Sequence, residues 1–213
     1  MNFPRILKKR KGYIVRIKPF MQKSVVKVLT GQRRVGKSFL LYQLIEEILA
    51  EEPDANIIYV NLEDFTFSSL QTAEDLHSYI ISHSKEKVKN YIFIDEIQDI
   101  PGFEKVIRSL LLNEDNDIYI TGSNAKMLSG ELATYLSGRY IEFKIYSLSY
   151  SEFLEFHGLT ESETSYELYS RELLQTLKQT NAELSNNRSY RIYGAINKKE
   201  GLASFSMQEC ILV

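Results

Sequence analysis

An eight-residue stretch, Gly31 to Ser38, has the residue types and the spacing of a phosphate-binding loop. It reads Gly-Gln-Arg-Arg-Val-Gly-Lys-Ser and matches the pattern G-x-x-x-x-G-K-[ST] at every fixed position. Glycines let the backbone curl so that its N–H groups point at phosphate oxygens, and the positive end of the following helix adds partial charge. Lys37 is expected to reach the β- and γ-phosphates, and the Ser38 hydroxyl to ligate Mg²⁺. A glycine-rich turn that binds no ligand is the alternative.

The loop stands in the setting that this motif requires. It follows the apolar run Val25 to Leu29 and precedes residues 41–49, where apolar side chains recur at helical spacing. We therefore expect the loop and the start of the helix to contact a bound nucleotide. The predicted nucleotide-binding residues are Gly31, Gln32, Arg33, Arg34, Val35, Gly36, Lys37, Ser38 and Phe39.

Two adjacent carboxylates, Asp95 and Glu96, end another apolar run that begins at Tyr91. Beside a phosphate loop, Asp95 is expected to hold Mg²⁺ through water and Glu96 to polarise an attacking water. A solvated acidic turn is the alternative, because Asp99 and Glu104 follow. An acid directly after the Asp favours hydrolysis by water over phosphoryl transfer to a small molecule.

Three further positions are candidates for the same chemistry. Asn124, and after it Ser123, follow the next apolar run and are candidates for orienting the water or touching the γ-phosphate, although a tight turn prefers the same residue types. Asn61 is a candidate for holding Glu96 in a waiting position, with a simple turn or cap as the alternative. Arg139 is a candidate for stabilising transition-state charge on a phosphate of a neighbouring subunit, and a surface salt bridge or structural pair is the alternative.

The elements that position these residues alternate between short apolar runs and helical patterns, which indicates a parallel sheet covered on both faces. The predicted helices cover residues 41–49, 73–82, 103–111 and 125–136. The run at 140–146 alternates apolar and polar residues, as an edge strand does. With right-handed crossovers, the order predicts a three-layer α/β/α fold over residues 21–150. The predicted strands are Ser24–Leu29, Asn56–Asn61, Asn90–Ile94, Asp117–Thr121 and Tyr140–Tyr146.

Composition excludes several other classes of protein. The 213 residues are 44% hydrophobic, and their longest apolar runs are far too short to cross a bilayer. No secretory signal follows the basic N-terminus, so we expect a cytoplasmic protein. One cysteine and three scattered histidines do not form a disulfide scaffold or a zinc site.

Charge is distributed unevenly along the chain. Residues 1–45 hold twelve Lys or Arg and no acid, while the remainder holds 14 basic and 28 acidic residues. Such a basic head either pairs with the acidic surface of its own chain, which we favour, or meets a polyanion such as DNA. The sequence pI of about 6.0 argues against strong binding of nucleic acid by the whole chain.

Five segments in this order carry a resemblance to a known family: Lys27–Ser38, Ile94–Gln98 (IDEIQ), Ile120–Ala125 (ITGSNA), Leu136–Tyr140 (LSGRY) and Ser151–Leu154 (SEFL). The first two are shared by many P-loop ATPases, whereas the order of TGSN and LSGRY is more specific. Together they make the chain similar to the prokaryotic AAA-type ATPases that continue into a C-terminal domain of unknown function. The resemblance covers about 130 of the 213 residues.

The resemblance implies an AAA+ core with strand order 5-1-4-3-2, ATP and Mg²⁺ at residues 31–38, and a Walker B pair at Asp95 and Glu96. It also implies a sensor near Asn124 and Arg139 as a candidate arginine finger. Similar proteins continue well beyond this length. We therefore expect three parts: a basic N-terminal lead (1–20), the ATPase core (21–158) and a partial or truncated C-terminal helical region (159–213).

The leading functional hypothesis is an AAA+ ATPase core that hydrolyses Mg-ATP to drive an unassigned conformational or partner-remodelling task. The alternative is a nucleotide-dependent interaction module with negligible hydrolysis, a hypothesis that includes association with DNA. Expected partners are ATP, further copies of the chain in a homo-oligomer, and an unidentified protein or DNA. A metabolite kinase is the weakest alternative, because the sequence offers no candidate acceptor site.

Overall fold

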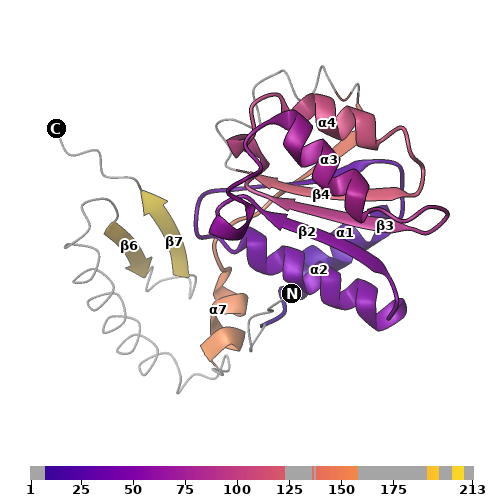
Figure 1. Ribbon diagram of the computed structural model, residues 1–213. Coiled ribbons are helices and arrows are strands. Elements are labelled where there is room, and N and C mark those ends of the chain that lie inside the picture. Colours follow the sequence, from indigo (N-terminus) through magenta and orange to yellow (C-terminus); the bar gives the residue numbers. More distant parts are fainter. Residues whose placement is uncertain (1–7, 123–135, 137, 158–190, 197–202, 209–213) are drawn as a thin grey trace. The chain divides into compact units, whose positions relative to one another are not determined.

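A parallel five-stranded sheet lies at the centre of the computed structural model (Figure 1). The structure describes residues 8–122, 136, 138–157, 191–196 and 203–208. The strands are rich in Ile, Val, Tyr and Phe, and every residue of β1, β3 and β4 is buried, as expected for strands covered on both faces. The five strands are β1 (Val26–Thr30), β2 (Asn56–Asn61), β3 (Asn90–Asp95), β4 (Asn116–Gly122) and β5 (Tyr140–Lys144).

The strand order is β2-β3-β4-β1-β5, and all four neighbouring pairs are parallel. This is the predicted order 5-1-4-3-2 read from the other edge, and β5 is an edge strand as predicted. Because parallel strands end at the same edge of a sheet, the ends of β1, β4 and β3 lie side by side in that order. The topology therefore brings the phosphate-loop segment and the two acids to one edge.

Helices cover both faces of the sheet and make the three predicted layers (Figure 1). On one face, α3 (Ala73–His83) and α4 (Phe103–Leu110) bury Leu76, Ile80 and Ile107 against strand residues such as Ile92. On the other face, α1 (Lys11–Ile17) and α2 (Lys37–Glu51) bury Ile14, Ile17 and Leu44 against residues such as Phe93. Apolar side chains at helical spacing thus produce one core on each side of the sheet.

The predicted elements differ from the structure mainly at their ends. The first strand begins at Val26 rather than Ser24, because the Val25 N–H donates to the Lys23 carbonyl (2.7 Å) in a turn. The predicted helix at 125–136 lies outside the described residues except for Leu136. The described ranges also include three short 3-10 helices, none of which the spacing predicted: η1 (Lys18–Phe20), η2 (Phe65–Phe67) and η3 (Ile97–Asp99).

The chain divides into two compact units, Met1–Ser147 and Leu148–Val213. The described part of the second unit contains α7 (Tyr150–His157) and an antiparallel pair, β6 (Arg191–Ile196) and β7 (Ala203–Gln208). A helical C-terminal region was expected, yet these two segments are strands, and β6 holds the strand-favouring residues Ile192, Tyr193 and Ile196. The expectation was based on apolar residues at helical spacing between Tyr166 and Leu177, which lie outside the described ranges. No helix in those ranges is long and apolar enough to span a bilayer.

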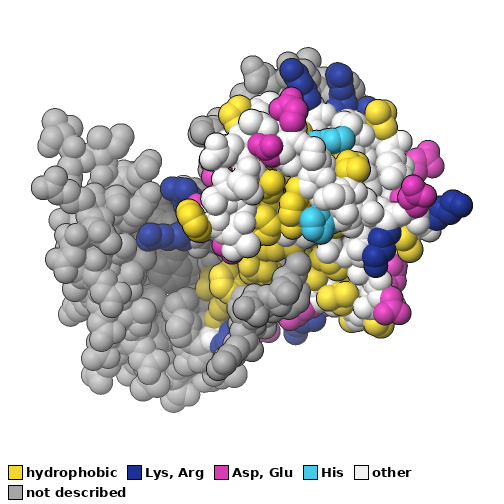
Figure 2. Space-filling model, in the orientation of Figure 1, with side chains coloured by type: hydrophobic (Ala, Val, Ile, Leu, Met, Phe, Trp, Pro, Cys, Tyr) yellow, Lys and Arg dark blue, Asp and Glu magenta, His cyan; other side chains and the backbone are white. Residues whose placement is uncertain are grey.

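Basic residues near the N-terminus pair with acids of the same chain. The Nζ atoms of Lys9 and Lys18 each lie 2.7 Å from a carboxylate on α2, that of Glu47 and Glu51 respectively. Charged side chains of both signs are interspersed on the face drawn in Figure 2. For Lys9 and Lys18, the structure therefore shows pairing with acidic side chains of the same chain, which is the interpretation favoured from the sequence.

Candidate nucleotide-binding site

The loop between β1 and α2 requires glycine at both of its fixed glycine positions. Gly36, directly before α2, has φ 90° and ψ 28°, in the left-handed region that L side chains rarely adopt. At Gly31 a Cβ atom would lie 2.3 Å from the carbonyl oxygen of Ile145, too close for any side chain. In the described part of the chain, no side chain caps the N-terminus of α2. Its first N–H groups are therefore available to an anion.

The residues around these glycines differ in exposure. Val35 is buried, whereas Gln32, Arg33 and Arg34 are exposed. Ser38 is half-buried in the first turn of α2, and the exposed ring of Phe39 stands edge-on to Tyr42. Arg33 reaches Glu63 (3.0 Å), an exposed ion pair that stabilises little.

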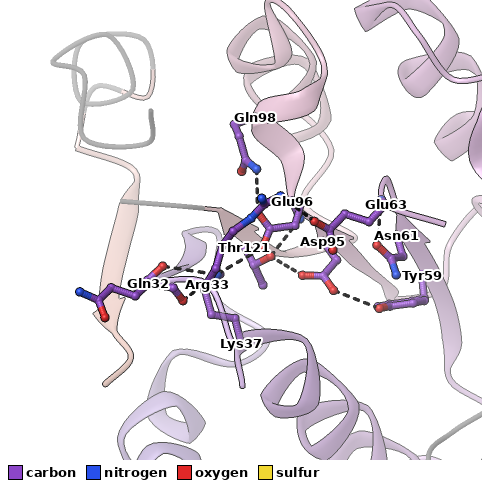
Figure 3. A network of polar contacts seen from close by, with 11 residues as sticks. Gln32, Arg33, Lys37, Tyr59, Asn61, Glu63, Asp95, Glu96, Gln98 and Thr121 are labelled. Atoms are coloured by element: carbon purple, nitrogen blue, oxygen red, sulfur yellow. Dashed lines mark hydrogen bonds and ion pairs between the residues drawn. The ribbon is translucent and has the colours of Figure 1, made fainter. Parts of the chain in front are cut away.

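Lys37 lies folded over the loop, with only 4% of the residue exposed. Its ammonium donates to the carbonyl oxygens of Gly31 and Gln32, both at 3.3 Å. It also lies 3.2 Å from Oε1 of Glu96. A cation from the start of α2 and a carboxylate from the end of β3 thus meet at the edge of the sheet (Figure 3).

The two acids after β3 are both buried, with Asp95 1% and Glu96 6% exposed. Thr121, near the end of β4, contacts both acids (Figure 3). Its hydroxyl donates to Oδ1 of Asp95, and the Thr121 hydroxyl oxygen accepts the Glu96 N–H at 3.0 Å. Glu96 has φ 55° and ψ 47°, an unusual backbone for a residue other than glycine. The solvated acidic turn considered from the sequence does not describe these buried side chains.

Three residues that the sequence analysis did not assign to the site also contact these acids. The Gln98 amide donates to Oε2 of Glu96 at 2.6 Å. The hydroxyl of Tyr59, on β2, lies 3.3 Å from Oδ2 of Asp95 and 3.1 Å from the Tyr42 hydroxyl. Thr121 was predicted only as the last residue of a strand. Tyr59 and Thr121 lie on strands that meet Asp95 only in the fold. Gln98, in contrast, stands two residues from Glu96 in the sequence.

Two of the predicted site residues make contacts other than those expected of them, although Asn61 itself pairs in register with Asp95 at the end of β2. The Asn61 side chain accepts the Glu63 N–H (3.0 Å), which is the turn alternative, while Glu96 pairs with Lys37 and Gln98. Arg139 is exposed and precedes β5, where its carbonyl accepts the Val26 N–H (3.0 Å) at the amino end of β1. The length of a five-residue strand, about 16 Å, separates that end from the phosphate-loop edge. Asn124 and Ser123 lie outside the described residues.

The buried acids are complemented by a second polar cluster in the sheet, at the ends of the strands away from the loop. Lys27 on β1 forms a fully buried ion pair with Asp117 on β4, and both side chains are 0% exposed. Asp117 also accepts from the Tyr119 hydroxyl (2.8 Å) and the Gln22 N–H (2.7 Å). Burial lowers the pKa of Lys27, although the Asp117 carboxylate opposes this effect. The pair ties together the two strands that lead to the loop and to Thr121.

Strand order, phosphate loop and acid pair together define the class of this protein. A parallel sheet ordered 5-1-4-3-2, with the loop after β1 and the acids after β3, is the P-loop ATPase core of AAA+ type. The model of the AAA domain family matches residues 23–154, which is more than half of the chain. The chain therefore belongs to the AAA domain family.

Relatives from a bacterium and an archaeon each match about three quarters of the chain. An uncharacterized protein of Haemophilus influenzae is 42% identical over 169 residues, covering 76% of this chain and 41% of the relative. An uncharacterized protein of Methanocaldococcus jannaschii is 34% identical over 155 residues, covering 72% of this chain and 34% of the relative. The chain thus spans less than half the length of these curated relatives.

A solved structure shows the same fold. The ORC1 protein of Aeropyrum pernix, in complex with DNA, matches with a TM-score of 0.52 and 14% sequence identity. The match covers 73% of this chain and 50% of that chain. At this identity, the likeness concerns the arrangement of the elements alone.

Proposed function

We propose that the chain binds Mg-ATP at the loop of residues 31–38 and hydrolyses its γ-phosphate with Glu96 as the general base. The observation that carries the proposal is the contact of 3.2 Å between the Lys37 ammonium and the Glu96 carboxylate. A phosphate-binding lysine and a base for the attacking water must both reach the γ-phosphate, and these two side chains already meet. The choice of ATP rests on membership of the AAA domain family.

The geometry of the loop supports phosphate binding. The left-handed Gly36 and the uncapped N-terminus of α2 leave N–H groups for phosphate oxygens. Lys37 donates to two neutral carbonyls, and phosphate oxygens are stronger acceptors for an ammonium. We therefore infer that Lys37 turns from the Gly31 and Gln32 carbonyls to the β- and γ-phosphates.

The residues around Asp95 fit a magnesium ion. Carboxylate and hydroxyl oxygens are the donors that Mg²⁺ prefers, and Asp95 and Ser38 supply one of each. The buried Asp95 carboxylate is oriented by two hydroxyls, those of Thr121 and Tyr59. Asp95, through water, and Ser38 would hold the ion. When bound, Mg²⁺ neutralises charge on the β- and γ-phosphates.

Glu96 performs the proton transfer in the proposed reaction. Its carboxylate takes one proton from a water, whose oxygen attacks the γ-phosphorus while the bond to the β–γ bridging oxygen breaks. The products are ADP and inorganic phosphate. Once phosphate draws Lys37 away, Gln98 still holds Oε2 of Glu96, so that Oε1 can face the water.

A second candidate function is a nucleotide-dependent interaction module with negligible hydrolysis. The observation that favours it is that both Glu96 oxygens are engaged, one by Lys37 and one by Gln98. A neighbouring copy supplying Arg139, or a protein partner, would then be needed to complete the site. DNA is a weaker choice of partner, because Lys9 and Lys18 of the basic head are already paired with acids.

The test is to measure Mg-ATP binding and hydrolysis by the chain and by two site variants, Lys37→Ala and Glu96→Gln. We expect Lys37→Ala to abolish binding, and Glu96→Gln to keep binding while losing turnover by about 10²- to 10⁴-fold. Lys18→Ala and Glu63→Gln, which alter exposed ion pairs, are the matched controls. Binding without turnover in the unmodified chain would select the interaction module, and absence of binding would reject both functions.

A further inference from the structure

Arg10 is the only one of four consecutive basic residues, Lys8 to Lys11, with a buried side chain. It is 4% exposed, and its neighbours Lys8, Lys9 and Lys11 are exposed. A buried guanidinium must have its N–H groups satisfied, because desolvation without hydrogen bonds is costly. The hydrogen bonds of the Arg10 guanidinium therefore indicate its structural role.

The guanidinium donates to backbone carbonyls of two separate segments. Its Nη1 donates to the Val35 carbonyl in the phosphate loop (3.1 Å) and to the Tyr146 carbonyl (2.9 Å). Its Nη2 donates to the Ser147 carbonyl (3.3 Å). Tyr146 and Ser147 follow β5 and are the last residues of the first compact unit. Arg10 thus bridges the phosphate loop and the segment that leads out of this unit.

The contact with Val35 fixes the direction of the next N–H group. The Val35 carbonyl and the Gly36 N–H belong to one planar trans peptide, so they point in opposite directions. A carbonyl held toward Arg10 therefore turns the Gly36 N–H away from Arg10. Gly36 is the loop residue directly before Lys37, and its N–H is among those expected to cradle phosphate.

Neighbouring residues hold Arg10 itself in place. Gln43 on α2 accepts the Arg10 N–H (2.8 Å) and donates to the Lys8 carbonyl (3.0 Å). The guanidinium stacks on the Tyr13 ring, 4.5 Å from its centroid. The Tyr13 hydroxyl accepts the Tyr146 N–H at 3.0 Å, so Tyr146 is held through both its N–H and its carbonyl.

We propose that Arg10 is a positioning residue that orients the phosphate loop for nucleotide and couples nucleotide binding to Tyr146 and Ser147. The planar fork of arginine serves both segments at once, which a lysine ammonium does less well. Through this coupling, nucleotide binding at the loop would affect Tyr146 and Ser147, the two residues directly before the second unit. The inference rests on the proposed function, since it assumes that the loop binds nucleotide.

The test compares Arg10→Lys with Arg16→Lys, a control on an exposed residue of the same helix region. We expect Arg10→Lys to weaken Mg-ATP binding about tenfold, as lost charged hydrogen bonds would. Without nucleotide, it should also speed hydrogen exchange at both 32–37 and 145–148, and Arg16→Lys should do neither. In the unmodified chain, nucleotide should protect both segments, and in Arg10→Lys only the loop. A residue that merely stabilised the fold would lower Tm but leave the coupled protection intact.

Two further results separate failure of this inference from failure of the proposed function. If the unmodified chain binds no nucleotide, the proposed function falls, and the exchange without nucleotide still decides whether Arg10 joins the two segments. If Arg10→Lys leaves exchange at 32–37 unchanged, the inference is overturned even though nucleotide binds. Should Arg10→Lys not fold, Gln43→Met removes the backbone anchor at similar volume. A smaller change in the same direction then supports the inference, and unchanged affinity and exchange overturn it.

Discussion

The Lys37 ammonium and the Glu96 carboxylate lie 3.2 Å apart and are both almost fully buried. The two groups form an ion pair with each other, and each is also proposed to take part in the phosphate chemistry. A phosphate that takes Lys37 thus releases Oε1 of Glu96 in the same event. In the proposed reaction the base therefore becomes free only when phosphate is bound, and its remaining partner, Gln98, then determines where it points.

Gln98 variants test this orientation. Gln98→Leu should lower turnover about tenfold or more with little change in nucleotide affinity, because the donor to Oε2 is lost. Gln98→Glu places a second carboxylate beside Glu96, and repulsion between the two carboxylates should lower turnover further than Gln98→Leu does. Steady-state kinetics of the two variants beside the unmodified chain measure both effects. Unchanged turnover in both variants would contradict the assigned contact.

Thr121 is expected to matter through its hydroxyl rather than its shape. Thr121→Val removes the donor to Asp95 and the acceptor for the Glu96 N–H, leaving buried groups unpaired. We expect a loss of about 2–4 kcal/mol in the free energy of unfolding, measured by urea denaturation. Thr121→Ser keeps the hydroxyl and should retain most of the stability. A larger loss in Thr121→Ser than in Thr121→Val would show that packing of the methyl group dominates instead.

Arg139 is predicted to act across a subunit boundary if it acts at all, because it lies at the opposite edge of the sheet from the loop of its own chain. Arg139→Ala should lower turnover while keeping nucleotide affinity. Mixing it with Lys37→Ala should restore activity, since the Lys37→Ala copy supplies an intact arginine to its neighbour. ATPase assays over a series of mixing ratios test this, and the absence of any recovery would rule out action between subunits.

The buried pair of Lys27 and Asp117 should show strong coupling in a double-mutant cycle. Asp117→Asn leaves the Lys27 ammonium buried without its counter-charge and is expected to cost about 3–5 kcal/mol of unfolding free energy. Replacing both residues, as Lys27→Met with Asp117→Leu, should recover much of that loss. Urea denaturation of Lys27→Met, Asp117→Leu and the double variant, beside the unmodified chain, gives the coupling energy. Additive losses would mean that the two side chains do not depend on each other.

The capping box of α3 predicts a loss of stability in acid. The Thr72 hydroxyl donates to the Asp75 carboxylate (2.7 Å), as does the Thr72 N–H (3.0 Å), and these bonds hold the pKa of Asp75 below its usual value. Because the folded-state pKa is the lower one, this stabilisation is complete above about pH 4 and is lost as pH falls through the folded-state pKa. Tm measured by circular dichroism from about pH 6 to about pH 3 should fall less steeply in Asp75→Asn.

The fold was predictable because its signals are local. Nearly continuous apolar runs indicated buried parallel strands, and the loop motif placed the phosphate-binding edge. The contacts of Thr121, Tyr59 and Arg10 were not predictable in this way, because each joins residues that are distant in the sequence. For Arg10, the four adjacent basic residues suggested pairing with acidic side chains or contact with a polyanion, and not hydrogen bonds to backbone carbonyls. The spacing of Ile14 and Ile17, one helical turn apart, was the available sign that this region packs on the core.

The position of β4 between β1 and β3 sets the span of the site. Neighbouring strands lie about 4.8 Å apart, so the ends of β1 and β3 are separated by about 10 Å. Were the two strands adjacent, the loop and the acids would be too close to admit a phosphoryl group and a water between them. Thr121, near the end of β4, lies between these two strands, and its hydroxyl contacts Asp95 and Glu96. In the proposed function, a long side chain at this position would compete with the phosphoryl group and the water for the same space.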